Sequence, residues 1–213
     1  AGLVTYREPL LLVDEDKVTG GRLRAIRSVI AHELAHMWFG NSVTLSWWND
    51  IWLNEAFATW MADHVEILIQ DEGRTYRSIA RSKQRVMRAD AKENVRAVRQ
   101  KIESDGDIEN AFDGITYRKG ASILWMLERW IGADQLRDAM RTYVRTFEHQ
   151  AVTTEDLLTL MDRETGKSVK AVTQRFLDSP GLPDLEFHID CKSNQSPKLT
   201  VTQRSSRTSD AQN

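Results

Sequence analysis

The sequence of 213 residues predicts a mainly α-helical fold of the α+β class, and two patterns lead to that prediction. Apolar residues recur at helical spacing through most of the chain between residues 20 and 179. Alternation of apolar and polar residues with period two is limited to short stretches, most of them near the two ends. A content of 41% hydrophobic and 28% charged residues is typical of a globular domain with a core of its own.

The first 15 residues predict strands, because "LVTY" alternates and "LLLV" forms a short apolar run typical of a buried strand. A helix follows the break at "VTGG" and is expected to end at Gly40, a stop signal. Its apolar residues at helical spacing are Ile26, Val29, Ile30 and Leu34. The segment "SVTLSWWND" predicts a strand and a turn, and a second helix is expected from Trp52 to the break at Gly73.

The remainder of the chain predicts further helices and a terminal hairpin. A charged helix over residues 74–89 precedes a polar loop over 101–114. Glycines, a Thr/Glu capping signature and Pro180 then mark the limits of four more helices, expected over residues 115–132, 133–147, 153–166 and 168–179. The stretches "LEFHID" and "KLTVTQR" alternate around a polar turn and predict a β-hairpin, after which "SSRTSDAQN" predicts a frayed tail.

The charge balance and the cysteine count exclude several function classes. A formal net charge of −2 provides no electrostatic basis for binding nucleic acid or an anionic membrane surface. No apolar run approaches the roughly 18–20 residues that span a bilayer, and "AGLVTYRE" lacks the pattern of a signal peptide. Cys191 is the only cysteine, so the sequence predicts neither an internal disulfide nor a cysteine-based metal cluster. These features favour a cytoplasmic location.

The segment "IAHELAHMWFG", residues 30–40, places three strongly hydrated groups within an otherwise apolar helix. His32 and His36 are four residues apart and project from one face of a helix, where both imidazoles can bind one zinc ion at about 2 Å. Glu33 lies about 100° around the helix, where it can reach a water molecule beside the metal without being a ligand. The alternative interpretation is that all three are ordinary helix residues, since H-E-x-x-H patterns also occur by chance.

A catalytic zinc ion needs a third protein ligand, and Glu55 is the candidate. It lies in the second predicted helix, and the eighteen residues that separate it from His36 suffice for an antiparallel return. Two helices packed face to face would form a His₂Glu site with one position left for water. The competing interpretation, an exposed helix glutamate, fits poorly with the apolar surroundings in "WWNDIWLNEAFATW".

The stretch "HELAHMWFGNSVTLSWWNDIWLNEAFATW" resembles the zinc-site segment of peptidase family M1, the gluzincin aminopeptidases. The family pattern, H-E-x-x-H followed by eighteen residues and E, is matched by His32, Glu33, His36 and Glu55. Downstream, "FDGITYRKGASILWML" resembles the segment that bears the family's catalytic tyrosine, here Tyr117. From the residues alone, such a tyrosine is more often half buried at a helix start. Alanine replaces the family's usual glycine after Glu55, and we expect slight crowding there without loss of metal.

The resemblance also implies a fold and a division into domains. It covers residues 1–183 and implies a thermolysin-like zinc metallopeptidase catalytic domain with a small N-terminal β portion. Residues 184–213 resemble the opening β-hairpin of the β-sandwich domain that follows it in the family, together with a polar tail. The family's G-x-M-E-N motif, which holds the substrate's amino group, would precede Ala1. We therefore expect a piece of a longer polypeptide, with the remaining domains as partners, that binds zinc but hydrolyses little substrate in isolation.

The activity implied is hydrolysis of the N-terminal bond of peptide substrates with a free N-terminus, with one catalytic Zn²⁺ as cofactor. In this role Glu33 takes a proton from water as general base and delivers it to the leaving amine. By resemblance, Tyr117 donates a hydrogen bond to the developing oxyanion. Two alternatives stay open: a thermolysin-type endopeptidase, which shares the His₂Glu ligands, and a catalytically silent relative that serves as a scaffold or interaction module.

Other prominent residues are predicted to lie outside the site. His64 is expected on the surface, and His149 and His188 are expected in a loop and a strand as non-ligands. Asn41 and Asp50 either orient the zinc ligands or only form turns. The basic residues of "RTYRSIARSKQRVMR" predict a solvated helix face. Five tryptophans near the motif are expected in the core: Trp38, Trp47, Trp48, Trp52 and Trp60.

Overall fold

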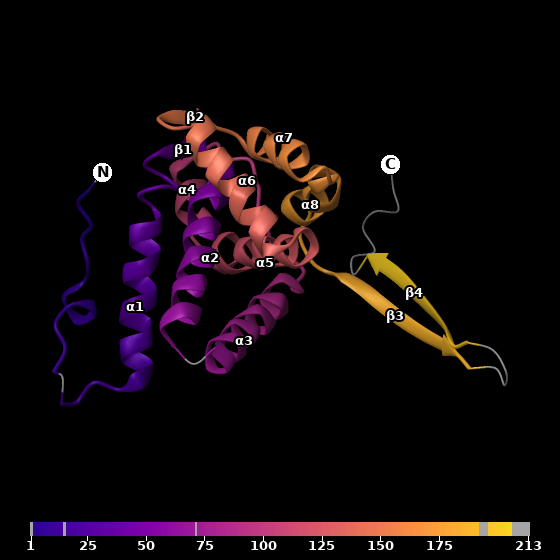
Figure 1. Ribbon diagram of the computed structural model, residues 1–213, viewed down its shortest axis with the longest axis horizontal. Coiled ribbons are helices and arrows are strands. Elements are labelled where there is room, and N and C mark those ends of the chain that lie inside the picture. Colours follow the sequence, from indigo (N-terminus) through magenta and orange to yellow (C-terminus); the bar gives the residue numbers. More distant parts are fainter. Residues whose placement is uncertain (1, 15, 71, 192–195, 206–213) are drawn as a thin grey trace.

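The computed structural model describes residues 2–14, 16–70, 72–191 and 196–205. Helices form a single body, and a two-stranded hairpin extends away from it (Figure 1). The prediction of a mainly α-helical domain with a few short strands is confirmed.

The N-terminal segment differs from the prediction. Residues 2–14 contain no strand, and their only regular element is a 3₁₀-helix, η1 (Glu8–Leu10). The apolar run expected to be buried is exposed, with Leu11 at 52% and Leu12 at 69% of full exposure. A strand needs a neighbour for its backbone hydrogen bonds, and no described strand pairs with this segment. The predicted strands are therefore wrong.

Two long helices and a short connection carry the H-E-x-x-H region. α1 (Gly20–Ala35) begins where the Thr19 hydroxyl accepts a hydrogen bond from the Arg22 amide, and it lies along α2 (Trp52–Ile69) (Figure 1). The connection contains β1 (Val43–Leu45) and the 3₁₀-helix η2 (Trp48–Asp50), which confirms the predicted strand and turn. β1 pairs in parallel with β2 (Gln150–Val152), a strand that the local pattern did not predict.

The polar loop predicted over residues 101–114 is partly helical. The charged helix α3 (Glu72–Asp90) is followed by irregular chain and then by α4 (Asp105–Ala111). Ser104 caps α4 by accepting from the Asp107 amide, while the Asp107 carboxylate accepts from the Ser104 amide. This reciprocal capping box is local chemistry that stabilises a short polar helix.

The remaining predicted helices are confirmed, with one change at a helix start. Residues 115–132 form a π-helical turn, η3 (Ile115–Lys119), before the α-helix proper, so the predicted single helix has two parts. A capping box of Thr153 with Asp156, and not with Glu155, opens the first helix after β2. The helices are α5 (Gly120–Ile131), α6 (Ala133–Thr146), α7 (Thr154–Thr165) and α8 (Val169–Asp178).

The C-terminal hairpin is confirmed. β3 (Pro183–Asp190) and β4 (Lys198–Ser205) pair antiparallel, with Phe187 opposite Val201. The hairpin lies beside the helical body and not within it (Figure 1), so apolar side chains on one of its faces are exposed, Phe187 at 62%. The predicted polar turn at 192–195 and most of the predicted tail, residues 206–213, lie outside the described residues.

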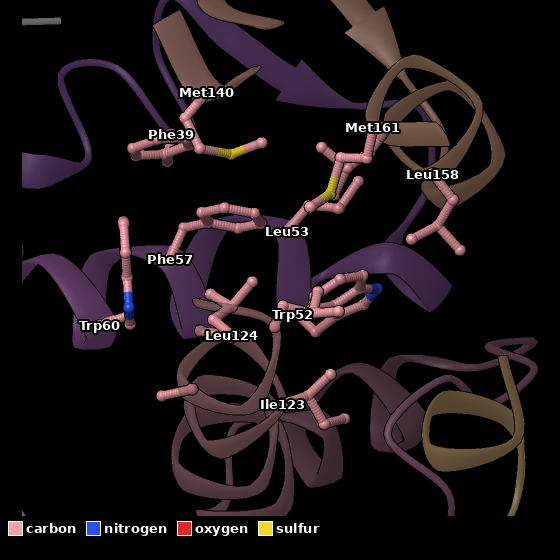
Figure 2. Close-up of a cluster of buried hydrophobic side chains, with 14 of the residues drawn as sticks. Phe39, Trp52, Leu53, Phe57, Trp60, Ile123, Leu124, Met140, Leu158 and Met161 are labelled. Atoms are coloured by element: carbon pink, nitrogen blue, oxygen red, sulfur yellow. The ribbon is translucent and has the colours of Figure 1, made fainter. Parts of the chain in front are cut away.

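The core lies between α2, α5, α6 and α7 (Figure 2). Trp52 and Phe57 of α2 are almost fully buried at its centre, and the Trp52 indole N–H donates to the Thr154 hydroxyl at 2.8 Å. The prediction that the tryptophans form core holds for Trp52 and Trp60. It is wrong for Trp38 and Trp47, which are 51% and 55% exposed, while Trp48 is half buried in a small second cluster. The spacing of apolar residues in the sequence did not distinguish the buried tryptophans from the exposed ones.

α2 and α5 pack closely at Ala56, one residue beyond Glu55. A Cβ added to Gly120 would lie 2.6 Å from the Cβ of Ala56, and the next atoms are 3.8 Å or more away. Ala56 is fully buried. Because Gly120 has no side chain, α5 leaves room for the methyl group of Ala56. The fold therefore accommodates an alanine directly after Glu55.

Gly120→Ala is expected to lower the free energy of unfolding by about 1–3 kcal/mol, because the two methyl groups overlap and the helices must separate. The higher helix propensity of alanine offsets up to about 1 kcal/mol of that loss. Chemical denaturation of the purified variant measures the change. Ala56→Gly combined with Gly120→Ala exchanges the two methyl positions, and this double variant should recover most of the stability. Equal stabilities of Gly120→Ala and the parent would contradict the packing described.

Candidate metal centre

His32 and His36 lie on the face of α1 that packs against α2, at its C-terminal end. Their four-residue spacing brings both Nε2 atoms to the same point, 3.2 Å from each other. Glu55, in the first turn of α2, points its carboxylate at the pair, with Oε2 at 3.1 Å from Nε2 of His32 and 3.4 Å from Nε2 of His36. The predicted convergence of two imidazoles and a distant carboxylate is therefore present.

The three atoms have the spacing that a tetrahedral zinc site requires. Zinc–nitrogen and zinc–oxygen bonds of 2.0–2.1 Å at tetrahedral angles place neighbouring ligand atoms about 3.3 Å apart. The observed separations of 3.1, 3.2 and 3.4 Å agree with that value. Among the described residues, the only group of three or more His, Cys, Asp or Glu side chains whose ligand atoms converge is His32, His36 and Glu55. Two imidazoles and one carboxylate form a donor set suited to catalytic zinc.

Hydrogen bonds on the far side of each ring orient the imidazoles. His36 Nδ1 lies 2.9 Å from the Phe39 carbonyl oxygen, which can only accept, so Nδ1 carries a hydrogen and Nε2 faces Glu55. Nε2 donates to Glu55 when the ring is protonated and offers a lone pair to a metal ion when the ring is neutral. His32 Nδ1 lies 3.4 Å from the Thr59 hydroxyl. Sequence reasoning missed both partners. The four-residue step from Glu55 to Thr59, one turn along α2, is the signal that could have identified the threonine.

Burial and hydrogen bonds oppose each other at Glu55 and His36, and the net pKa is shifted downward for Glu55 and upward for His36. Burial disfavours ionisation of Glu55, but hydrogen bonds from His32 and His36 outweigh it and lower its pKa to about 2. The position of Glu55 in the first turn of α2 adds the favourable field of the helix N-terminus. Burial lowers the pKa of His36, and the hydrogen bond to Glu55 reverses that effect, so the net pKa is raised. The carboxylate is thus an anion at neutral pH, as a ligand to a cation must be.

Glu33 and Tyr117 lie near the three converging side chains without joining them. Glu33 is partly exposed on α1, and its charge raises the pKa of both His36 and Tyr117. The Tyr117 ring stacks on the His32 ring, with centroids 5.7 Å apart. Burial, followed by the charge and hydrogen bond of Glu55, raises the pKa of Tyr117, so its hydroxyl stays protonated at neutral pH. A proton acceptor and a neutral hydroxyl donor therefore border the cluster.

Comparison with known proteins shows the family to which the chain belongs. The profile of the peptidase family M1 domain matches residues 1–176. The chain belongs to peptidase family M1. The M1 domain is similar to Aminopeptidase M1 of Arabidopsis thaliana, with 34% identity over 182 residues, 85% of this chain and 21% of the relative. It is 35% identical over 190 residues to the mitochondrial Aminopeptidase 2 of Saccharomyces cerevisiae, covering 89% of this chain and 20% of the relative.

A bacterial relative has the same extent of similarity. Aminopeptidase N of Lactococcus lactis is 34% identical over 186 residues, 85% of this chain and 22% of that protein. The chain thus spans about a fifth of the length of the curated relatives it matches. Within the part of the chain that the structure describes, no helix combines the length and apolar character needed to cross a membrane.

A buried ion pair anchors the π-helical turn that bears Tyr117 in the M1 domain. Lys119 and Asp90, each 5% exposed or less, pair at 2.8 Å between η3 and the end of α3. The Lys119 ammonium also donates to the carbonyl oxygens of Ser179 and Gly181, both at 3.3 Å. π-Helical turns often occur at functional sites, and these contacts tie this one to α3 and to the chain after α8.

The other singled-out residues of the M1 domain lie away from the cluster. His64 Nε2 lies 2.9 Å from a Glu128 carboxylate oxygen and its ring stacks on Trp125, so the predicted surface histidine is only one-third exposed. Asp50 accepts from the amide and hydroxyl of Thr154 and holds the start of α7, so a role in orienting the ligands is wrong for it. The side-chain amide of Asn41 lies 3.5 Å from the Met37 sulfur, a contact within its own turn of the chain. His149 and His188 are exposed.

Proposed function

We propose that this protein is a zinc-dependent metallo-aminopeptidase, with His32, His36 and Glu55 as the metal ligands. The observation that carries the proposal is the convergence of these three side chains, at tetrahedral ligand spacing, in a chain that belongs to family M1. The relatives at about 34% identity are named aminopeptidases, which supports peptides with a free N-terminus as the substrates. The cytoplasmic location stays a prediction.

The catalytic steps of the protein follow from the side chains around the cluster. A bound zinc ion supplies a Lewis acid that polarises the scissile carbonyl and acidifies water. Glu33, beside the ligands but not among them, takes the proton of the attacking water onto its carboxylate and transfers it to the leaving nitrogen. Tyr117 donates its hydroxyl hydrogen to the carbonyl oxygen as that oxygen becomes negative. The raised pKa of Tyr117 supports this role, because only the neutral phenol can donate.

Tyr117→Phe is expected to lower kcat by roughly 10²–10³-fold, the usual effect of losing one oxyanion donor. The phenylalanine keeps the ring that stacks on His32, so zinc content and KM should change little. Steady-state kinetics with an aminoacyl-naphthylamide on a natural form with measurable turnover, and elemental analysis of the same sample, measure the three quantities. A kcat within a factor of two of the parent would remove Tyr117 from the mechanism.

The proposal includes a thermolysin-like catalytic domain over residues 1–183 and the start of a β-sandwich over 184–213. The exposed apolar face of the hairpin supports the second part, because such a face is typical of a sheet that packs against further strands. The chain spans about a fifth of its relatives, which agrees with additional domains as partners. The prediction that these 213 residues hydrolyse little substrate alone belongs to the same proposal.

The experiment compares matched peptides with a free and an acetylated N-terminus, in the 213-residue chain and in the longest natural form that contains it. The proposal predicts stoichiometric zinc and cleavage only of the free peptides, with loss of cleavage in 1,10-phenanthroline. Cleavage of both peptides would instead support a thermolysin-type endopeptidase. Stoichiometric zinc with no cleavage in the longest form would support a catalytically silent scaffold.

A further inference from the structure

A hollow of about 450 Å³ opens between α1, α2, α3 and η3, the elements that also carry the metal-centre residues or adjoin them. Ser28, on its α1 wall, lies one helical turn before His32, which is about 6 Å along the helix axis. Arg118, on its η3 wall, directly follows Tyr117. The hollow therefore begins about one turn from the proposed catalytic side chains. Its volume lies in the range of ligand-binding pockets.

The walls of the hollow are strongly cationic. They contain six arginines and two carboxylates, Asp63 and Glu66. Four of the arginines follow one stripe of α3, at intervals of three, four and four residues, and the other two come from α1 and η3. The six are Arg24, Arg74, Arg77, Arg81, Arg85 and Arg118. The sequence predicted only a solvated face here, and the structure places that face along a concave surface.

The two carboxylates of the hollow already have cationic partners. Asp63 lies 3.4 Å from the Arg118 guanidinium and accepts a hydrogen bond from the Trp125 indole. Glu66 lies 3.6 Å from the Arg27 guanidinium, which comes from the adjoining part of α1. Asp63 and Glu66 therefore already have positively charged partners from α1 and η3. Their charges do not neutralise Arg77, Arg81 and Arg85 of α3.

Three arginines of α3 are without a counter-ion. Arg77, Arg81 and Arg85 are exposed, and among the described residues none of them has a hydrogen bond or ion pair. A guanidinium presents a planar fork of donors that matches the two oxygens of a carboxylate. Three such groups along one wall of a hollow favour binding of an anion.

The length of the arginine stripe can be compared with that of an extended peptide. The arginine stripe from Arg74 to Arg85 spans eleven residues, or about 16 Å of helix. An extended peptide advances about 3.3–3.6 Å per residue, so four or five residues beyond the metal centre would follow this stripe. Since an aminopeptidase has only one substrate residue on the amino side of the cleaved bond, the remainder of the peptide is the part that such a hollow could accommodate.

We propose that this arginine-lined hollow binds a carboxylate of the peptide substrate, three to five residues from its N-terminus. This inference rests on the proposed function for the presence of a peptide at the metal centre. The carboxylate comes either from an acidic side chain or from the C-terminus of a short peptide, and both sources offer the same chemistry. The expected consequence is a preference for acidic peptides over neutral peptides of equal length.

The test measures binding separately from hydrolysis. Isothermal titration calorimetry at low ionic strength, with the neutral chelator 1,10-phenanthroline to prevent cleavage, compares Ala-Ala-Ala-Glu-Ala with Ala-Ala-Ala-Gln-Ala. Each peptide is used with a free and an amidated C-terminus, which separates the two sources of the carboxylate. We expect each carboxylate to strengthen binding roughly fivefold, because charge-assisted hydrogen bonds to exposed guanidinium groups are weakened by water, and the gain to diminish at high salt.

Two variants locate the effect. Arg81→Gln combined with Arg85→Gln should abolish the preference for acidic peptides. Arg88→Gln, on the same helix but not in the wall of the hollow, should retain it. Equal binding of acidic and neutral peptides, or an equal loss in the Arg88 control, would overturn the proposal and favour a solvated face or the docking of an acidic protein domain.

Hydrolysis of the same peptides with zinc present distinguishes this proposal from the proposed function. In the longest natural form that contains this chain, binding that depends on Arg81 and Arg85 without any cleavage would support the anion site and remove the peptidase activity. Cleavage of the acidic and neutral peptides at equal kcat/KM and with equal affinity would support the activity and overturn the anion site.

Discussion

Replacing His36 with alanine is expected to abolish zinc binding and, with it, peptide hydrolysis. The imidazole is one of only three proposed protein ligands, and two ligands do not retain a zinc ion at a catalytic site. The Nε2 atom of His36 lies 3.2 and 3.4 Å from its two partners, so no other described side chain is placed to replace it. Elemental analysis after dialysis should fall from about one zinc ion per chain to near zero.

The matched control for this variant is His188→Ala. His188 is an exposed histidine of β3, far along the chain from the cluster, so the control removes an imidazole without touching a ligand. It should keep zinc and activity. Circular dichroism of both variants verifies that the helices remain. Full zinc occupancy in His36→Ala would show that the ion is bound elsewhere.

Glu33→Gln is expected to keep zinc and to lower kcat by roughly 10²–10⁴-fold, the contribution of a positioned general base. The amide has the size of the carboxylate but accepts no proton from water at neutral pH. Glu33 is not among the three converging side chains, so metal content should not change. Kinetics on a natural form with measurable turnover, with zinc analysis of the same sample, tests both halves of the prediction.

A second partly buried glutamate, on α5, provides the control for that result. Glu128 is a glutamate with partners of its own, His64 and Trp60, outside the cluster. Glu128→Gln should therefore leave kcat within a few fold of the parent. If Glu33→Gln had near-normal turnover, or if it lost zinc, the assignment of Glu33 as a base and not a ligand would be wrong.

Local sequence signals predicted the elements whose determinants are local. Apolar periodicity and caps located α2, α6, α7 and α8 and the terminal hairpin to within a few residues. The proposed ligand positions of His32 and His36 came from helix geometry, because an i, i+4 pair faces one way whatever the rest of the fold does. Glu55 came from its place on a second helix, eighteen residues after His36, and from the family pattern. The capping box of Ser104 and Asp107 was also local, and the prediction of a loop there overlooked it.

Features that depend on distant partners were not predictable in this way. Leu11 and Leu12 form an apolar run, but no neighbouring strand among the described residues pairs with it, and they stay exposed. The parallel pairing of β1 with β2 joins residues more than a hundred positions apart. The proposed role of Tyr117 came mainly from family resemblance, since the π-helical turn that directs it towards His32 has no signature in the residue pattern.

The most direct test of the metal centre is zinc K-edge X-ray absorption on the chain loaded with one equivalent of zinc. The proposed site predicts a single zinc environment of nitrogen and oxygen neighbours at about 2.0–2.1 Å, with two imidazole rings in the outer shell and no sulfur. Glu55→Ala should replace one oxygen with solvent and weaken the affinity. A spectrum with a single imidazole, or one that is unchanged in His36→Ala, would contradict the ligand set on which the proposed chemistry depends.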